Sequence, residues 1–168
     1  RPVICVSVLQ GSRSLTLCVN HWKSKLGGEK ESALWRSWQE SVLARLLLET
    51  NGSAAVACGD FNRDIEEFTK GTESGAVFLR GAGFGTVSET GVTSPWLSEN
   101  ACGMYSYYYE GKGERIDHFF TAGQAKVLSF AAETDGPWAD EEGIPVRYAM
   151  YTGKGYSDHL PIAASIRY

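Results

Sequence analysis

Four short segments place histidine, aspartate or asparagine at points where an apolar stretch ends. They are Val19-Asn20-His21, Cys58-Gly59-Asp60-Phe61-Asn62, Arg115-Ile116-Asp117-His118 and Tyr156-Ser157-Asp158-His159. All three histidines of the chain fall in these segments. Because catalytic groups concentrate on loops that rigid strands hold in place, the four segments together indicate one functional site.

The chemistry that these residue types suit is hydrolysis of a phosphate ester. Aspartate carboxylates and asparagine carbonyls are hard oxygen ligands for Mg²⁺, which also binds substrate phosphates. A histidine near neutral pH can take a proton from an attacking water, and a neighbouring carboxylate can fix its tautomer. A bound metal ion would neutralise charge on the phosphoryl and leaving oxygens.

The loop segments also have structural interpretations. Asp60 or Asn62 could form an Asx turn after a strand, in which the side chain bonds its own backbone. The segment Ser157-Asp158-His159 could simply cap the strand that follows it. Each of these alternatives stays open from the sequence alone.

The other two segments also have structural interpretations. Asp117 could pair with Arg115 or Lys112 in a surface ion pair that contributes little stability. A lone histidine such as His21 is usually a hydrogen-bonded strand-end residue. His118 is predicted to be structural, because side chains alternate along a strand and it faces away from Asp117.

Composition limits the class of protein. The 168 residues fit one domain, and 43% hydrophobic with 21% charged residues is typical of a globular chain. No apolar run reaches the roughly 18–20 residues that span a bilayer, so no membrane span is expected. Four cysteines without a C-x-x-C pair make a structural zinc site an unlikely use of them. The compartment stays undecided.

Net charge limits the substrate. With 16 basic and 20 acidic residues the chain carries a net charge of −4, so it has no broad cationic field to hold nucleic acid. A phosphate ligand must therefore be bound locally. A divalent cation could supply the missing positive charge.

Residues Val3–Leu9 and Ser14–Asn20 are predicted to be the two strands of a β-hairpin around Gly11-Ser12. A two-residue turn there sets Ile4, Val6 and Val8 opposite Val19, Leu17 and Leu15, and it sets Cys5 opposite Cys18. A disulfide is possible in this register. We favour two buried thiols instead, because free cysteine is commonly buried.

The next segment predicts an amphipathic helix with Ser32 as its N-cap. Its apolar stripe is expected to face a sheet and to bury both tryptophans. The stripe consists of Leu34, Trp35, Trp38, Val42, Leu43, Leu46 and Leu47.

The rest of the chain alternates short strands with loops. Strands are expected at 54–58, 127–131 and 161–166, and a second hairpin is expected from 104–109 and 114–121. Residues 59–85 are expected to form a loop with one short helix near 65–68, and 133–155 a surface excursion rather than a second domain. The pattern predicts an α+β domain.

In order and spacing, these motifs closely resemble the endonuclease/exonuclease/phosphatase superfamily, which includes deoxyribonuclease I and exonuclease III. The resemblance runs from Val3 to the C-terminus and is specific for the family, with little information about substrate. It rests on Asn20-His21-Trp22-Lys23-Ser24-Lys25, Gly59-Asp60-Phe61-Asn62, Arg115-Ile116-Asp117-His118 and Ser157-Asp158-His159-Leu160-Pro161.

The resemblance implies a four-layer α/β/β/α sandwich of the deoxyribonuclease I-like type, with a divalent-metal site at one end of the strands. It implies Mg²⁺, or Mn²⁺ or Ca²⁺, as the cofactor and a phosphate ester, including nucleic acid, as the substrate. By the same resemblance His159 is the general base or main phosphate-contacting histidine, and Asp117 orients it. Asp158 is a metal-site carboxylate.

The other roles follow from the same likeness. Asp60 resembles a residue that positions the nucleophilic water and holds metal, and Asn62 one that contacts phosphate. His21 resembles a second phosphate-contacting histidine, and Asn20 has a weaker case as a phosphate ligand.

The chain departs from the family in one respect. Members usually run to about 250 residues or more, beyond the modal domain size, and their first half supplies an asparagine and the main metal-binding glutamate. Neither can be located here. We therefore expect residues 1–168 to be a single domain or the C-terminal part of one, with the N-terminal half missing or acting as a partner, and little activity in this chain alone.

Three functions stay open. The leading one is a metal-dependent, nuclease-like phosphodiesterase in which metal-activated water attacks phosphorus. The second is phosphatase or phospholipid phosphodiesterase chemistry on the same fold. The third is a non-catalytic fragment or interaction module that lacks the main metal ligand.

Overall fold

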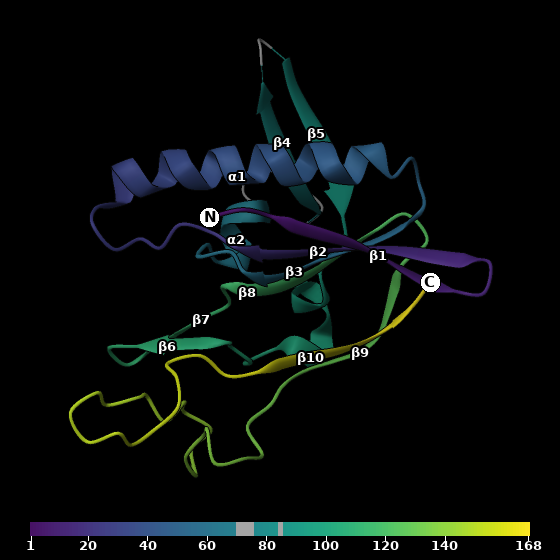
Figure 1. Cartoon of the computed structure of the whole chain (residues 1–168). Helices are drawn as coiled ribbons and strands as arrows, with labels where there is room; N and C mark the ends of the chain where they lie inside the picture. The colour runs from purple at the N-terminus through teal and green to yellow at the C-terminus, as the bar shows by residue number, and fades with distance from the viewer. Residues whose placement is uncertain (70–75, 84–85) are drawn as a thin grey trace.

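The computed structural model describes residues 1–69, 76–83 and 86–168. Figure 1 shows the arrangement of its helices and strands. In chain order these are β1 (Ile4–Gln10), β2 (Arg13–His21), α1 (Glu29–Glu49), β3 (Ala54–Asp60), α2 (Ile65–Thr69), β4 (Val77–Gly83), β5 (Thr86–Val92), the 3₁₀ turns η1 (Pro95–Leu97) and η2 (Glu99–Ala101), β6 (Tyr107–Tyr109), β7 (Lys112–Glu114), β8 (Asp117–Ala122), β9 (Lys126–Ala132) and β10 (Ile162–Arg167).

The main sheet has the strand order β1-β2-β3-β8. Strand β2 pairs antiparallel with β1 and parallel with β3, and β8 runs antiparallel to β3. The turn at Gly11 has a positive φ of 60°, which glycine adopts at little cost. The predicted hairpin register is confirmed, since Ile4 lies opposite Val19 and Cys5 lies opposite Cys18.

Cys5 and Cys18 form a disulfide, so the prediction of two free thiols is wrong. The register brings their Cα atoms to 4.1 Å, well inside the roughly 7 Å beyond which a bridge needs backbone movement. The bond joins the edge strand β1 to β2. Cys58 and Cys102 are free thiols.

Helix α1 begins earlier than predicted, and it buries Leu43 and Leu47 of the predicted stripe together with residues from outside that stripe. Its N-cap is Gly28, and Ser32 lies inside the first turn, where its hydroxyl donates a 2.7 Å hydrogen bond to the Gly28 carbonyl. Trp35 and Trp38 are each 53% exposed, so the prediction that they are core residues is wrong. The buried residues of the helix are Ser32, Arg36, Glu40, Leu43, Ala44 and Leu47.

Two charged side chains on this buried face explain the difference. Arg36 pairs with Glu29, and Glu40 pairs with Arg63 at 2.6 Å. Glu40 also accepts a 2.9 Å hydrogen bond from the backbone N–H of Arg80. Burying a charge is tolerated when it is paired and hydrogen-bonded. Arg36 finds its partner within α1, whereas Glu40 depends on Arg63 and Arg80 from distant segments.

The prediction of a continuous loop after residue 59 is wrong over residues 77–83, which form β4. This strand pairs with β5 and packs against α1. Val77 and Leu79 are 1% and 0% exposed, so the strand fills the space beneath the helix. The predicted short helix is present as α2. The glycines at 71, 75 and 85 of the predicted loop lie outside the described residues.

The second predicted hairpin is shorter than expected. It consists of β6 and β7 alone, and β8 joins the main sheet beside β3. The predicted strands near 127–131 and 161–166 are present as β9 and β10, which pair antiparallel. The excursion between them lies at the surface and forms no separate sheet.

The α+β sandwich is confirmed, with α1 above the main sheet and the β9–β10 pair below it (Figure 1). On the helix side the core contains Trp22, Phe61, Phe68 and Leu43. On the other side Ile166 of β10 packs against a smaller core. Within the described residues, no second layer of α-helix covers the β9–β10 sheet.

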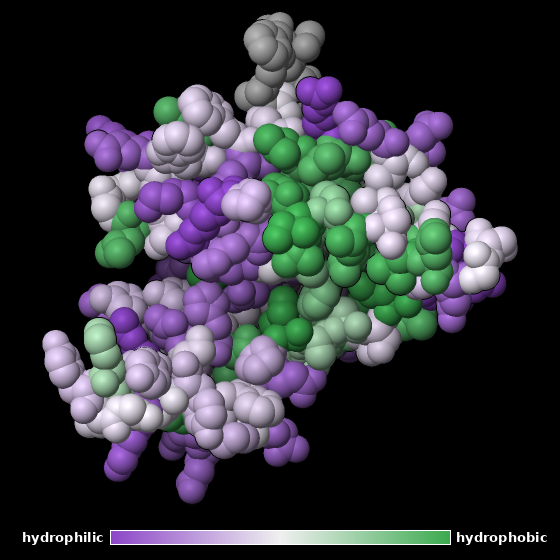
Figure 2. Space-filling model, viewed as in Figure 1, coloured by the Kyte–Doolittle hydropathy of each residue, from purple (hydrophilic) through white to green (hydrophobic). Residues whose placement is uncertain are grey.

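One face of the sandwich is apolar and exposed. Figure 2 shows hydrophobic residues gathered where β1 and α1 lie in Figure 1. On β1 these include Ile4, Val6 and Val8, and Val42 on α1 is also exposed. Among the described helices, none combines the length and apolar character needed to cross a membrane.

Candidate active site

The predicted site residues lie where four strands of the two sheets begin or end. His21 ends β2, Asp60 ends β3, Asp117 begins β8, and His159 comes three residues before β10. Figure 1 shows these strand ends at the same side of the molecule. The sheet register sets His21 beside Asp60, and Asp60 opposite Asp117.

His159 and Asp117 form the central contact of the site. The distance from Nδ1 of His159 to Oδ2 of Asp117 is 2.8 Å. Burial lowers the pKa of His159, but the hydrogen bond and the charge of Asp117 outweigh it, so the pKa is raised overall. The free nitrogen, Nε2, lies 4.0 Å from Oδ1 of Asp158.

Ser106 holds this pair together, a role that the sequence alone did not assign to it. It is fully buried, and its Oγ accepts a 3.0 Å hydrogen bond from the Asp117 backbone N–H. Its carbonyl accepts a 2.7 Å bond from the N–H of Leu160, the residue after His159. One residue therefore fixes the backbone on both sides of the contact.

Asp60 and Asn62 form the second part of the site. The Asn62 backbone N–H donates to Oδ1 of Asp60 at 2.7 Å, and the Asn62 amide donates to Oδ2 at 2.8 Å. The Asx turn considered from the sequence is therefore present. His21 Nε2 lies 3.4 Å from Oδ2 of Asp60.

The charge state of Asp60 depends on its surroundings. Burial raises its pKa, and the nearby charge of Asp117 raises it further. The Asn62 hydrogen bond and the two histidines, His159 and His21, act in the opposite direction. Positive charge brought into the site would therefore favour the ionised form of Asp60.

Asn20 does not line the cleft. It is 3% exposed, its amide donates to the Cys18 carbonyl at 2.9 Å, and its Oδ1 accepts from Trp22 Nε1 at 3.0 Å. A Cβ at Gly59 would lie 2.0 Å from the Asn20 carbonyl oxygen, so only glycine fits beside it. In this position Asn20 shapes the backbone, and the geometry gives its predicted phosphate contact no support.

His118 is buried, as strand alternation predicts. It is 0% exposed, and its Nε2 lies 2.8 Å from the Arg63 carbonyl oxygen. Its ring packs among Phe61, Phe68 and Phe120. Burial lowers its pKa to about 4, so the ring is neutral near pH 7 and does not belong to the site.

The polar strand ends open into a cleft of about 790 Å³. His21, Asp60, Asn62, Asp158 and His159 line it, so five predicted site residues share one cavity. The rest of the polar and aromatic lining comes from loops and from the β6–β7 hairpin. Ser24 and Lys25 belong to a motif that carries the family resemblance. Sequence reasoning assigned no role in the site to the others, which are Arg1, Tyr107, Tyr109, Glu110, Glu114, Lys112 and Arg147.

The carboxylates of the cleft are its candidate ligands for a divalent cation. Within residues 1–69, 76–83 and 86–168, no group of three or more acidic, histidine or cysteine side chains is placed to hold a metal ion. Mg²⁺ usually binds through one or two carboxylates together with water and substrate phosphate oxygens. Asp60 and Asp158 both line the cleft and have the carboxylate chemistry that such a site uses.

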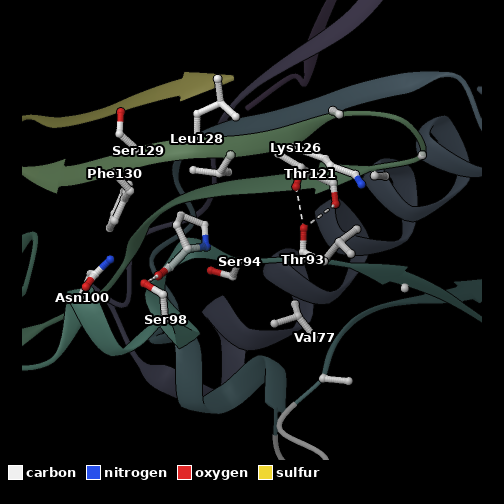
Figure 3. A pocket seen from close by; sticks show the side chains of 18 of the residues that line it. Val77, Thr93, Ser94, Ser98, Asn100, Thr121, Lys126, Leu128, Ser129 and Phe130 are labelled. Carbon is white, nitrogen blue, oxygen red and sulfur yellow. Dashed lines mark hydrogen bonds between the residues drawn. The ribbon is translucent and has the colours of Figure 1, made fainter. Parts of the chain in front are cut away.

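A second cavity, of about 770 Å³, lies away from these residues (Figure 3). Its labelled lining residues include Val77, Leu128 and Phe130, together with hydroxyl groups of Thr93 and Thr121 that lie 2.5 Å apart. The ammonium group of Lys126 is the one charged group in its lining, as far as the described residues show. This cavity therefore lacks the acid–base groups that the first cleft has.

The comparisons with known proteins identify the fold. No protein-family model and no curated protein sequence matches the chain. A humanized zebrafish (D. rerio) TDP2 is similar over 99% of this chain and 60% of its own, with a TM-score of 0.64 and 18% identity. Caenorhabditis elegans TDP2 is similar over 95% of this chain and 44% of its own, with a TM-score of 0.59 and 16% identity.

A further similar structure is SmcL, with a TM-score of 0.51 and 15% identity over 98% of this chain and 57% of its own. The chain thus spans about half the length of the solved structures that it matches. These neighbours share the architecture that the motifs imply. The chain has the deoxyribonuclease I-like fold that these solved structures share.

Proposed function

We propose that this chain carries the site of a divalent-metal-dependent phosphoester hydrolase, with nuclease-like phosphodiester cleavage as its leading activity. The observation that carries the proposal is the 2.8 Å contact between His159 Nδ1 and Asp117 Oδ2 at the edge of a polar cleft. Such a pair suits general-base hydrolysis, because the carboxylate orients the imidazole and fixes its tautomer.

The proton is handled by His159. Because Nδ1 is bonded to Asp117, Nε2 is the nitrogen left to accept a proton from an attacking water. Once protonated, the same nitrogen can donate a hydrogen bond to a phosphate oxygen. The carboxylate of Asp117 holds the imidazole in place and stabilises the imidazolium that forms, as carboxylates do in other acid–base pairs.

The remaining polar groups bind and orient. Asp60 is assigned to positioning the attacking water, Asn62 and His21 to contacting phosphate oxygens, and Asp158 with Asp60 to the metal. When bound there, Mg²⁺, Mn²⁺ or Ca²⁺ supplies positive charge that offsets the charge of the phosphate. Asn20 is left out of this assignment because it is buried behind the cleft.

The charge of the chain bears on its substrate class. The net charge of −4 disfavours extensive contact with duplex nucleic acid. A phosphatase or phospholipid phosphodiesterase would use the same polar groups. We therefore propose hydrolysis of phosphate esters as the general activity and single-stranded or short nucleic acid as the leading substrate.

One observation favours a second candidate, a non-catalytic interaction module. In the described part of the chain the carboxylates do not form a complete metal cage. Against this, His159, Asp117, Asp60 and Asn62 keep mutual hydrogen bonds that an interaction module would not need. Catalysis is accordingly the first proposal.

The test is a substrate panel with matched variants. DNA, RNA, an inositol phosphate and a choline phospholipid would each be incubated with the chain in Mg²⁺ or EDTA. We expect hydrolysis that EDTA abolishes and that His159→Ala and Asp117→Ala reduce by about 10²-fold or more. Tyr151→Ala is the control, because Tyr151 is fully exposed outside the cleft. Full activity of His159→Ala would contradict the proposal.

A further inference from the structure

One wall of the cleft consists of aromatic and basic side chains that the proposed hydrolysis does not use. The rings of Tyr107 and Tyr109 are nearly parallel, with centroids 6.4 Å apart and planes 8° apart. The guanidinium of Arg147 lies 5.5 Å from the centroid of Tyr109. Tyr107 lies on the other side, with its ring 4.8 Å from that of His159. The series runs from the catalytic histidine to an arginine.

The backbone that carries Arg147 is held firmly. The Val146 N–H donates to the Trp138 carbonyl at 2.8 Å, and the Tyr156 N–H donates to the Val146 carbonyl at 2.7 Å. A Cβ at Gly155 would lie 2.2 Å from the Arg147 carbonyl oxygen, so the backbone at Gly155 lies against the backbone at Arg147. The side chain itself is 63% exposed to solvent and faces the cleft.

The two lysines of the cleft pair with glutamates that lie outside the catalytic cluster. Lys25 pairs with Glu67 and Glu114, and Lys112 pairs with Glu114. These glutamates are not assigned to the metal or to the reaction. The lysine charges are therefore already compensated outside the catalytic cluster.

Arg147 pairs with a residue of the catalytic cluster. Its Nε lies 3.8 Å from Oδ2 of Asp158, which is assigned to the metal. When Asp158 binds a cation, its charge is shared and its attraction for Arg147 weakens. Tyr109 then keeps the guanidinium in place through the cation–π contact. The result is a guanidinium held in the cleft next to Asp158, and its planar set of hydrogen-bond donors suits a phosphate group.

We propose that Arg147 is a specificity-determining residue that binds a second phosphate group of the substrate, next to the ester that is cleaved. This rests on the proposed function, and it adds that the preferred substrate carries at least two phosphates a short distance apart. A nucleic acid strand and a small bisphosphate both have this chemistry.

The test measures binding, so it does not depend on turnover. Dissociation constants of thymidine 3′,5′-bisphosphate and thymidine 5′-monophosphate are measured by calorimetry in Mg²⁺ for the chain and its variants. Wild type is expected to bind the bisphosphate roughly tenfold or more tightly, the amount that a charge-assisted hydrogen-bonded pair contributes. Arg147→Gln is expected to remove most of that preference, and Arg147→Lys part of it, because lysine lacks the planar fork.

Two further variants separate a specific role from a general loss of charge. Lys154→Gln removes one positive charge from the same loop, outside the cleft lining, and is expected to keep the preference. Tyr109→Leu removes the ring beneath the guanidinium and is expected to weaken the preference by severalfold, while Tyr109→Phe keeps it. Thermal unfolding of each variant confirms that it is folded.

The outcomes are distinct. The inference is overturned if wild type shows no preference for the bisphosphate, if neither nucleotide binds, or if Arg147→Gln keeps the preference. A second pair, inositol 1,4-bisphosphate against inositol 1-phosphate, identifies the source of the second phosphate: a preference confined to the thymidine pair indicates nucleic acid. If hydrolysis is absent but the Arg147-dependent preference is present, the proposed activity fails and the binding role stands.

Discussion

The imidazole of His159 and the carboxylate of Asp117 are 42 residues apart in the chain and 2.8 Å apart in space. The antiparallel entry of β8 beside β3 places Asp117, and the turn before β10 places His159. The buried Ser106 hydrogen-bonds to the backbone next to both. A change at Asp117 should therefore alter how His159 titrates.

The pH dependence of hydrolysis tests this relationship. The imidazole must lose its proton to act as a base, so kcat/KM should rise with pH through the pKa of His159, which Asp117 raises. Asp117→Asn removes that charge and leaves burial, which lowers the pKa. We expect the rising limb of the pH–rate profile to shift to lower pH, and the plateau to fall by about 10²–10⁴-fold. An unshifted limb would show that another group is titrating.

The buried ring of His118 predicts how stability depends on pH. Its pKa is about 4 in the folded chain against an ordinary 6.5, so the unfolded chain binds the proton first as pH falls. Its contribution is fully present above pH 6.5 and is lost as pH falls toward 4, by roughly 3 kcal/mol. Urea unfolding across this range measures the loss.

Two variants make that assignment specific. His118→Gln keeps a donor for the Arg63 carbonyl but does not titrate, so its stability should change less between pH 6.5 and 4. His21→Gln is the matched control, because that side chain is 60% exposed. Equal slopes for wild type and His118→Gln would rule out His118 as the source.

The disulfide should contribute to stability mainly by restricting the unfolded chain. It closes a loop of 13 residues in sequence separation, for which loop-closure entropy predicts about 3 kcal/mol. The double variant Cys5→Ser and Cys18→Ser should lose about this much free energy of unfolding. Cys102→Ser, at an exposed free thiol, should lose almost none. A reductant that leaves the stability of wild type unchanged would contradict this contribution.

Metal binding should be weak in this chain without a phosphate ligand. Two carboxylates, Asp60 and Asp158, are the acidic groups assigned to the ion, and no larger cluster exists among the described residues. Calorimetric titration with Mg²⁺ should show no micromolar binding, and added nucleotide should strengthen it because phosphate oxygens complete the coordination. Micromolar affinity for Mg²⁺ alone would show that further ligands are present.

The sequence by itself determined the local features of the protein. The first hairpin, with Cys5 opposite Cys18, follows from a two-residue turn and strand alternation. The same alternation separates His118 from Asp117. The four polar segments lie at strand ends because an apolar run stands beside each of them. Hydrophobic periodicity and turn residues involve only a few neighbouring residues, so they can be recognised in the sequence alone.

Features that depend on distant partners were decided by the tertiary structure. The inward face of α1 depends on Arg63 and the Arg80 backbone meeting Glu40, and β4 is held by β5 and α1. The inward turn of Asn20 depends on backbone carbonyls of β2 and β3. A local pattern records how apolar a face is, but it does not record which charged or polar group a distant segment will bring to pair with it, and that pairing decides which face can be buried.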